Sequence, residues 1–186
     1  MLGLSFEPVP ARIPEDPRPG EGAEELAVRL ARAKALAVAA DRPGALVLGG
    51  DTVVALDDRL LAKPADEEDA VRMLLELSGR THEVLTAVAL ALPAGEVLTG
   101  VSPARVRFRS FGRPTAEAYA ATGEPLDKAG GYGIQARGAA LVSHIRGDYY
   151  SVVGLPVALF LELLEEAGWL YRFGTLERAE SGSGSR

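Results

Sequence analysis

The feature that most constrains the fold of this chain is an apolar run with a polar motif inside it. Residues 45–48 and 53–56 are apolar, and Gly49-Gly50-Asp51-Thr52 lies between them. Such a run is typical of a strand buried on both faces, which occurs mainly in α/β proteins. These proteins bind ligands at strand ends, so Asp51 is a candidate functional carboxylate. On its own, however, a Gly-Asp-Thr sequence is more often a turn capped by its aspartate.

The remaining periodicity also favours an α/β architecture. Helical patterns cover residues 23–40, 67–77, 115–121 and 155–166, with Asp66 and Thr115 as expected N-caps. Alternating patterns predict strands at residues 82–92, 96–111 and 139–145, the first two joined as an antiparallel hairpin. We therefore expect a mixed, twisted sheet with helices on both sides and two lobes around a central cleft. Residues 1–178 should form one domain, followed by a flexible Ser- and Gly-rich tail at residues 179–186.

Composition limits the chemistry available to this domain. The 186 residues include no Cys and two His, which excludes thiolate metal sites and cysteine nucleophiles. The 26 acidic and 20 basic side chains give a net charge of −6, which disfavours a general nucleic-acid binder but permits a local cationic pocket. Without an apolar stretch of ~18 residues or a secretory leader, we expect no membrane partner and a cytoplasmic location. A metal would be held by carboxylates, which favours Mg²⁺ or Mn²⁺.

Several residues are candidates only in combination with others. Lys34 lies in a helix rich in alanine and leucine and, taken singly, is a lysine that extends to the surface. Lys63 is, in the same way, most simply a solvated side chain. Gly130-Gly131-Tyr132-Gly133 is costly in a helix or strand and fits either an irregular loop or a binding loop. His82 and His144 have no metal-ligand spacing around them, so we interpret both as structural.

Taken in order, the motifs of this chain resemble those of the Maf family of nucleoside triphosphate pyrophosphatases. The matching blocks are residues 34–35, 50–54, 63–64, 77–84, 124–135 and 153–156. The resemblance extends to about Trp169. It implies a fold like that of Maf and inosine triphosphatase proteins. It also implies a hydrolase that uses a divalent cation to split a nucleoside triphosphate into the monophosphate and pyrophosphate.

The resemblance also implies roles for individual residues. Asp51 matches the catalytic aspartate, as base or metal ligand, and Glu15 falls near the family's second acidic metal position. Lys34 and Lys63 match the lysines that line the phosphate site. Thr52 and Gln135 match positions associated with the branch that prefers dTTP and UTP. Modified pyrimidine nucleotides as further substrates, and assembly into a homodimer, are secondary expectations.

The chemistry of the proposed substrate agrees with these roles. A triphosphate carries about four negative charges, so its site needs lysines together with a divalent cation. Attack at the α-phosphorus needs an oriented water, which a carboxylate such as Asp51 can hold. The amide of Gln135 offers a donor and an acceptor that match O4 and N3–H of uracil or thymine.

One segment departs from the family pattern. The family opens with a strand and a Ser-x-Ser-Pro-Arg-Arg loop, whereas this sequence starts at Met1-Leu2-Gly3-Leu4. Arg12 and Arg18 do not stand in that motif, so its phosphate-binding role is not transferred to them. We expect the form written here to be weak or inactive without such a segment. One alternative is therefore a nucleotide-binding protein that has lost hydrolysis together with this loop. A second alternative, implied by the family's link to septum formation, is a regulatory partner of the division machinery.

Overall fold

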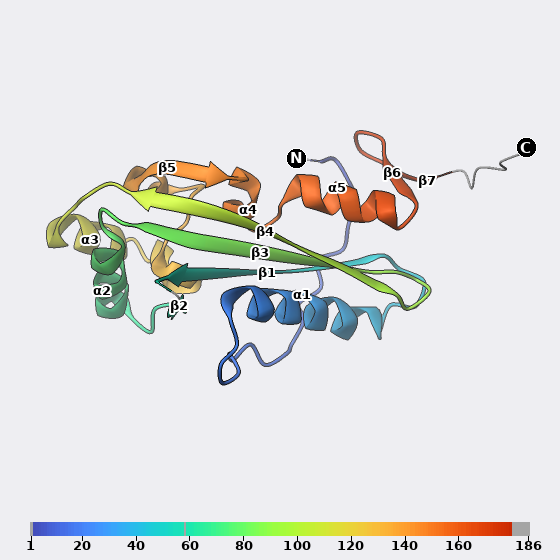
Figure 1. Cartoon of the computed structure of the whole chain (residues 1–186), viewed down its shortest axis with the longest axis horizontal. Coiled ribbons are helices and arrows are strands. Elements are labelled where there is room, and N and C mark those ends of the chain that lie inside the picture. The colour runs from blue at the N-terminus through green and yellow to red at the C-terminus, as the bar shows by residue number, and fades with distance from the viewer. Residues whose placement is uncertain (1, 58, 180–186) are drawn as a thin grey trace, which may run out of the picture.

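A five-stranded sheet forms the centre of the molecule, which the computed structural model describes for residues 2–57 and 59–179. The strand order is β2-β1-β3-β4-β5, and every described pair runs antiparallel (Figure 1). The strands are β1 (Val47–Leu56), β2 (Arg59–Leu61), β3 (Thr81–Ala91), β4 (Val97–Phe108) and β5 (Val142–Gly147). A separate hairpin follows, made of β6 (Trp169–Tyr171) and β7 (Leu176–Arg178).

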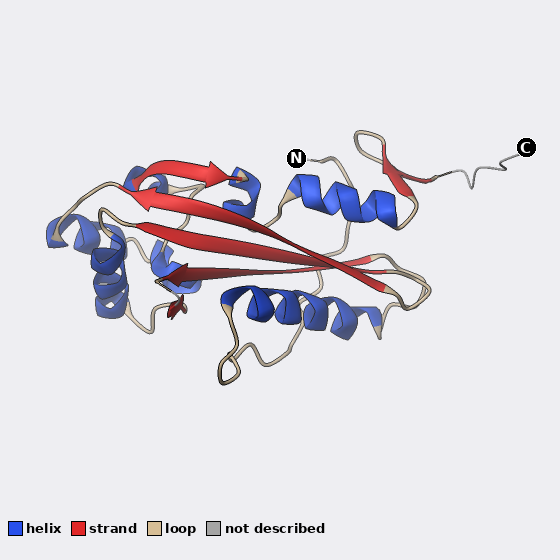
Figure 2. Ribbon diagram, viewed as in Figure 1, coloured by secondary structure: helices blue, strands red, loops and turns tan. Residues whose placement is uncertain are grey.

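Helices cover both faces of this sheet, as Figure 2 shows. The α-helices are α1 (Ala23–Ala39), α2 (Glu67–Leu77), α3 (Arg113–Ala120), α4 (Tyr149–Val153) and α5 (Val157–Glu166). Three short 3₁₀ segments, η1 (Glu124–Asp127), η2 (Ala129–Gly131) and η3 (Arg137–Leu141), carry the chain between α3 and β5. In the described ranges, no helix is long and apolar enough to cross a membrane.

Successive side chains of a strand point to opposite faces of the sheet, so β3 packs against a different helix on each face. On one face, the small side chains Ala87, Ala89 and Ala91 of β3 pack against α1. On the other face, Val88 and Leu90 pack against Phe160, Leu163 and Leu164 of α5. A third cluster fills the end of the sheet under α2 and α3, and it includes Leu74, Leu77 and Phe108.

The expected α/β class, the helices on both faces and the β3–β4 hairpin are confirmed. The helix expected at residues 67–77 is also confirmed, and the Asp66 carboxylate accepts from the Asp69 amide at 2.8 Å. In detail, the strand directions differ from the mixed set expected, since all described pairs are antiparallel. The connection through β2 and α2 leaves β1 at Leu56 and enters β3 at the same end of the sheet, so the chain returns antiparallel.

Other boundaries depart from the sequence expectations. The sequence predicts Thr115 as an N-cap, but α3 begins two residues earlier, after Gly112, because Pro114 suits the first helical turn. Residues 139–141 form part of η3 and not a strand, and β5 starts at Val142. The sequence patterns did not predict α4 or the β6–β7 hairpin. The expected tail at residues 179–186 lies, apart from Ala179, outside the described residues.

Candidate active site

A cavity of about 870 Å³ lies beside the open edge of β1. Among the described strands, β2 pairs with β1 only at the three residues from Val54 to Leu56, so the edge from Gly50 to Val53 faces the cavity. The cavity is bounded on one side by α1 and on the other by the glycine-rich residues 127–136. This arrangement corresponds to the cleft between two parts of the fold that the sequence led us to expect.

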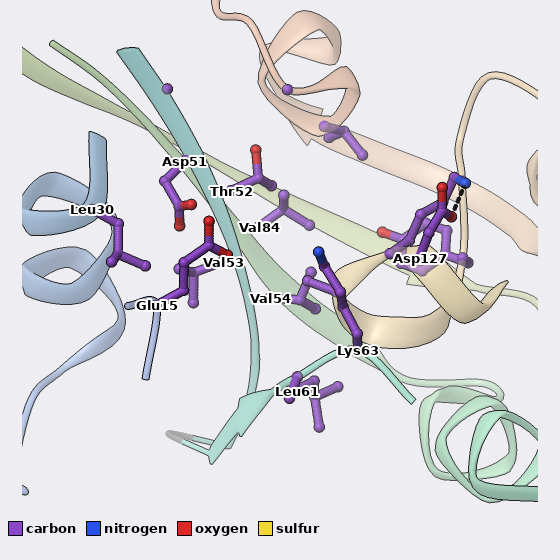
Figure 3. A pocket seen from close by; sticks show the side chains of 18 of the residues that line it. Glu15, Leu30, Asp51, Thr52, Val53, Val54, Leu61, Lys63, Val84 and Asp127 are labelled. Carbon is purple, nitrogen blue, oxygen red and sulfur yellow. Dashed lines mark hydrogen bonds and ion pairs between the residues drawn. The ribbon is translucent and has the colours of Figure 1, made fainter. Parts of the chain in front are cut away.

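The chemical centre of the cavity is a cluster of two carboxylates and one ammonium group. Lys34, from α1, places its Nζ atom 2.6 Å from Oδ1 of Asp51 on β1. The same Nζ atom lies 2.8 Å from Oε1 of Glu15, in the segment that precedes α1. Figure 3 shows the carboxylates of Asp51 and Glu15 directed toward the same part of the cavity. Its sequence context alone suggested a surface lysine, but Lys34 is a member of the site.

The close contact between α1 and β1 explains how Lys34 reaches Asp51. Gly49 and Asp51 point to the same face of β1, toward α1. A Cβ atom on Gly49 would lie 2.4 Å from the Ala31 carbonyl oxygen and 2.6 Å from the Ala35 amide nitrogen. Only glycine therefore allows α1 to pack this closely, and Lys34 lies on the stretch of helix that this contact fixes. The first glycine of the motif thus serves helix packing.

Burial and hydrogen bonds shift the pKa values of the three groups of this cluster in different directions. Burial raises the pKa of the Asp51 carboxyl, in opposition to the lowering effect of Lys34. The more exposed Glu15 has its pKa lowered, chiefly by the hydrogen bond from Lys34. Burial by itself would lower the pKa of Lys34, but its hydrogen bonds to Asp51 and Glu15 raise it. Lys34 thus stays protonated, while Asp51 is the carboxylate that accepts a proton more readily than usual.

The donor set of Glu15 and Asp51 fits a hard divalent cation. Their oxygens converge on one point, where the Lys34 ammonium shows that positive charge is accommodated. Within residues 2–57 and 59–179 there is no group of three or more His, Asp and Glu side chains suited to a metal. Mg²⁺ is commonly held by one or two carboxylates, with water and substrate phosphate completing the octahedron. Glu15 and Asp51 would hold a cation in this way, and the divalent cation stays a prediction from the sequence.

Lys63 brings a second positive charge to the cavity. It follows β2 and is exposed, whereas the next residue, Pro64, is buried. Its charge contributes to the lowered pKa of Glu15 and, more weakly than the adjacent Lys128, to that of Asp127. In Figure 3 the Lys63 amine points into the space between Asp51 and Asp127. The cavity therefore presents lysines from two different elements to an anionic ligand.

Thr52 and Gln135 line the same cavity from other directions. Thr52 points to the face of β1 opposite Asp51, and its Oγ1 atom lies 2.8 Å from Oγ1 of Thr86 on β3. Gln135 is exposed in the turn between η2 and η3. All six residues singled out from the sequence thus border one cavity: Glu15, Lys34, Asp51, Thr52, Lys63 and Gln135.

Hydrogen bonds from two side chains, Tyr119 and Glu124, hold the loop that carries Gln135. The Glu124 carboxylate accepts from the Tyr119 hydroxyl at 2.8 Å and from the Gly138 amide at 3.1 Å. The Gly133 amide donates to the Tyr119 oxygen at 3.1 Å. These contacts fasten the loop on both sides of Gln135. The sequence did not identify Tyr119 and Glu124 as supports, because nothing in their local pattern shows which loop they meet.

His82 supports the same loop from the sheet. Its side chain is 1% exposed, and Nε2 lies 2.8 Å from the hydroxyl oxygen of Tyr132. Burial lowers the pKa of His82 to about 4, so the ring is neutral at pH 7. The expectation of a structural role for His82 is thus consistent with its place in the core. His144, on β5, is exposed and does not line the cavity.

Comparison with known proteins finds similar sequences over most of this chain. Residues 1–167 match the family model described as Maf-like protein. A dTTP/UTP pyrophosphatase of Symbiobacterium thermophilum is 45% identical over 169 residues, which is 91% of this chain and 87% of that protein. Proteins of the same description from Deinococcus radiodurans and Myxococcus xanthus are 48% and 50% identical. Each of these two alignments covers 90% of this chain and 85% of the relative.

Proposed function

The chain belongs to the Maf family, and from this premise we propose that it is a nucleoside triphosphate pyrophosphatase that acts on dTTP and UTP. In this reaction a water oxygen bonds to the α-phosphorus and the bond from that phosphorus to the bridging oxygen breaks. The products are the nucleoside monophosphate and pyrophosphate. The observation that carries the proposal is the convergence of Glu15, Lys34, Asp51, Thr52, Lys63 and Gln135 on one cavity. Its volume is in the range of sites that enclose small molecules.

The residues of the cluster divide the work of hydrolysis. Lys34 and Lys63 attract the triphosphate and offset its charge. Asp51 orients the attacking water and accepts its proton. Lys34 holds Asp51 in place at 2.6 Å while remaining protonated itself. A divalent cation held by Glu15 and Asp51 would neutralise charge on the phosphates and on the departing pyrophosphate.

The pyrimidine ring would lie toward Thr52 and Gln135, on the other side of the β1 edge from Asp51. The Gln135 amide N–H complements the O4 acceptor of uracil or thymine. These two bases differ by a methyl group at C5. A site that takes both must leave room at C5, so we include pyrimidine nucleotides modified at that carbon among the substrates.

Product analysis tests the proposal. The protein would be mixed with dTTP, UTP, CTP and GTP, in Mg²⁺ or in excess chelator, and monophosphate and pyrophosphate would be measured separately. We expect both products from dTTP and UTP in equal amounts, and their loss in chelator. Release of orthophosphate and a diphosphate would mean that a different bond is cleaved.

A calorimetric titration with the same nucleotides separates catalysis from binding. Tight binding of UTP without turnover would instead favour the alternative of a nucleotide-binding protein. Absence of both binding and turnover would contradict the proposed function altogether.

A further inference from the structure

A row of hydroxyl groups crosses the sheet beneath the cavity. Thr52 on β1 is the register partner of Thr86 on β3, and Thr86 is the partner of Ser102 on β4. The short helix α4 packs over this row through Ser151. Thr86 and Ser151 are completely buried, whereas Thr52 also borders the cavity. The row therefore connects the sheet interior to one wall of the site.

The direction of each hydrogen bond in this row follows from counting protons. The carbonyl oxygen of Ser151 lies 2.7 Å from Oγ1 of Thr86 and also accepts from the Gly154 amide at 3.0 Å. A carbonyl has no proton to give, so the Thr86 hydroxyl must donate in this contact. A hydroxyl has a single proton. In the 2.8 Å contact between Thr86 and Thr52, Thr86 is consequently the acceptor and Thr52 the donor.

The Thr52 hydroxyl is thereby left with one chemical character on its open side. Its proton is directed to Thr86, so only its lone pairs are available to a ligand in the cavity. The Thr86 hydroxyl cannot reverse these directions, because it is buried and the Ser151 carbonyl oxygen can only accept a hydrogen bond. We propose that Thr86 is a specificity-determining positioning residue, which fixes the Thr52 hydroxyl as an acceptor toward the base of the nucleotide. This inference rests on the proposed function.

A fixed acceptor at this point selects among pyrimidines. Uracil and thymine carry a proton on N3 and can donate it to Thr52. Cytosine has a lone pair on N3, so an acceptor would meet an acceptor and a desolvated polar atom would stay unpaired. Thr52 thus discriminates between the bases at N3, in addition to the amide of Gln135. Thr86 controls this discrimination through Thr52 and does not itself contact the substrate.

The test is the ratio of kcat/KM for UTP to kcat/KM for CTP in Thr86→Val. Valine keeps the shape of threonine but offers no acceptor, so the Thr52 hydroxyl becomes free to donate to N3 of cytosine. We expect the ratio to fall by roughly tenfold, the equivalent of one modest hydrogen bond. Thr86→Ser retains the hydroxyl and should keep the ratio of the unaltered protein. Calorimetric binding of α,β-methylene analogues of UTP and CTP should shift in the same direction.

Two controls separate discrimination from general damage. Ser102→Ala removes the 2.6 Å contact with the Ser151 hydroxyl but leaves the proton of Thr86 committed to the carbonyl, so the ratio should not change. Thermal unfolding reports whether each variant is folded. If Thr86→Val does not fold, Thr86→Ala removes the same acceptor without a branched side chain and should also lower the ratio.

The outcomes for the inference and for the proposed function are distinct. An unaltered protein with no preference for UTP over CTP would overturn both. If the unaltered protein prefers UTP, and folded Thr86→Val or Thr86→Ala keeps that preference, the role of Thr86 is wrong while the proposed function stands. An equal fall in activity toward both nucleotides would make Thr86 merely structural and would also overturn the inference.

Discussion

The ammonium nitrogen of Lys34 lies 2.6 Å from a carboxylate oxygen of Asp51, and this ion pair joins α1 to the open edge of β1. The Asp51 side chain is 10% exposed and that of Lys34 is 21% exposed, so the pair is shielded from bulk water yet still borders the cavity. Pairs in such surroundings interact more strongly than exposed ones. The contact therefore positions the carboxylate on which the proposed hydrolysis depends.

Asp51→Asn should abolish most turnover and leave the fold intact. Asparagine keeps the shape of the side chain but cannot accept a proton or hold a cation by charge, and such roles are worth roughly 10²–10⁴ in rate. Pyrophosphate release from UTP measures the effect. Asp57→Asn is a matched control, because Asp57 is an exposed carboxylate at the end of β1 that pairs with Arg80. Unaltered turnover in Asp51→Asn would contradict the catalytic role.

The two adjacent glycines of β1 should respond differently to alanine. Gly49→Ala places a Cβ atom 2.4 Å from the Ala31 backbone, so α1 must move, with a cost of about 1–3 kcal/mol or more in the free energy of unfolding. Gly50→Ala meets no protein atom closer than 3.6 Å. Chemical denaturation should therefore show a loss of stability for Gly49→Ala alone. Because Gly50 borders the cavity, its variant should instead raise KM for UTP.

Gln135→Ala should reduce the preference for UTP over CTP by about 1–3 kcal/mol, the usual effect of leaving a polar partner unmet. Steady-state kinetics with both nucleotides measures this change. Gln135→Glu keeps the shape of the side chain and an acceptor oxygen but loses the amide donor. It should therefore weaken UTP turnover although the side chain is isosteric. An equal decrease for all nucleotides would mean that Gln135 only supports its loop.

His82 should make the stability of the protein depend on pH. Its pKa is about 4 in the fold because of burial, against an ordinary value of 6.5. Between these values the unfolded chain binds a proton that the folded protein does not, so stability decreases as pH falls from about 6.5 to about 4. The full difference corresponds to about 3 kcal/mol.

Urea denaturation at a series of pH values measures this contribution. His82→Gln does not titrate and should show a shallower loss of stability toward acid than the unaltered protein. His144→Gln, at an exposed position on β5, should keep the original slope. If His82→Gln and the unaltered protein lose stability in parallel, the neutral, buried state of His82 is wrong.

The elements with a strong local signal could be read from the sequence. The helical periods of α1 and α2, the Asp66 cap and the alternating β3–β4 hairpin depend on residues close together in the chain, and the structure has them near their expected bounds. The candidate site residues were chosen from motifs of the same local kind. Each motif by itself had a plain structural explanation, and only their order along the chain favoured a common site.

Tertiary structure decided what those residues do to one another. That Lys34 pairs with Asp51 follows from the approach of α1 to Gly49, and the helix pattern of residues 23–39 does not contain that contact. The acceptor character of Thr52 likewise depends on Thr86 and on a carbonyl of Ser151, which is 65 residues beyond Thr86. Local sequence fixes which backbone conformations and side-chain types are available. The direction of a hydrogen bond and the pKa of a buried group are set by atoms that meet only when distant segments pack together, and there the sequence pattern carries no signal.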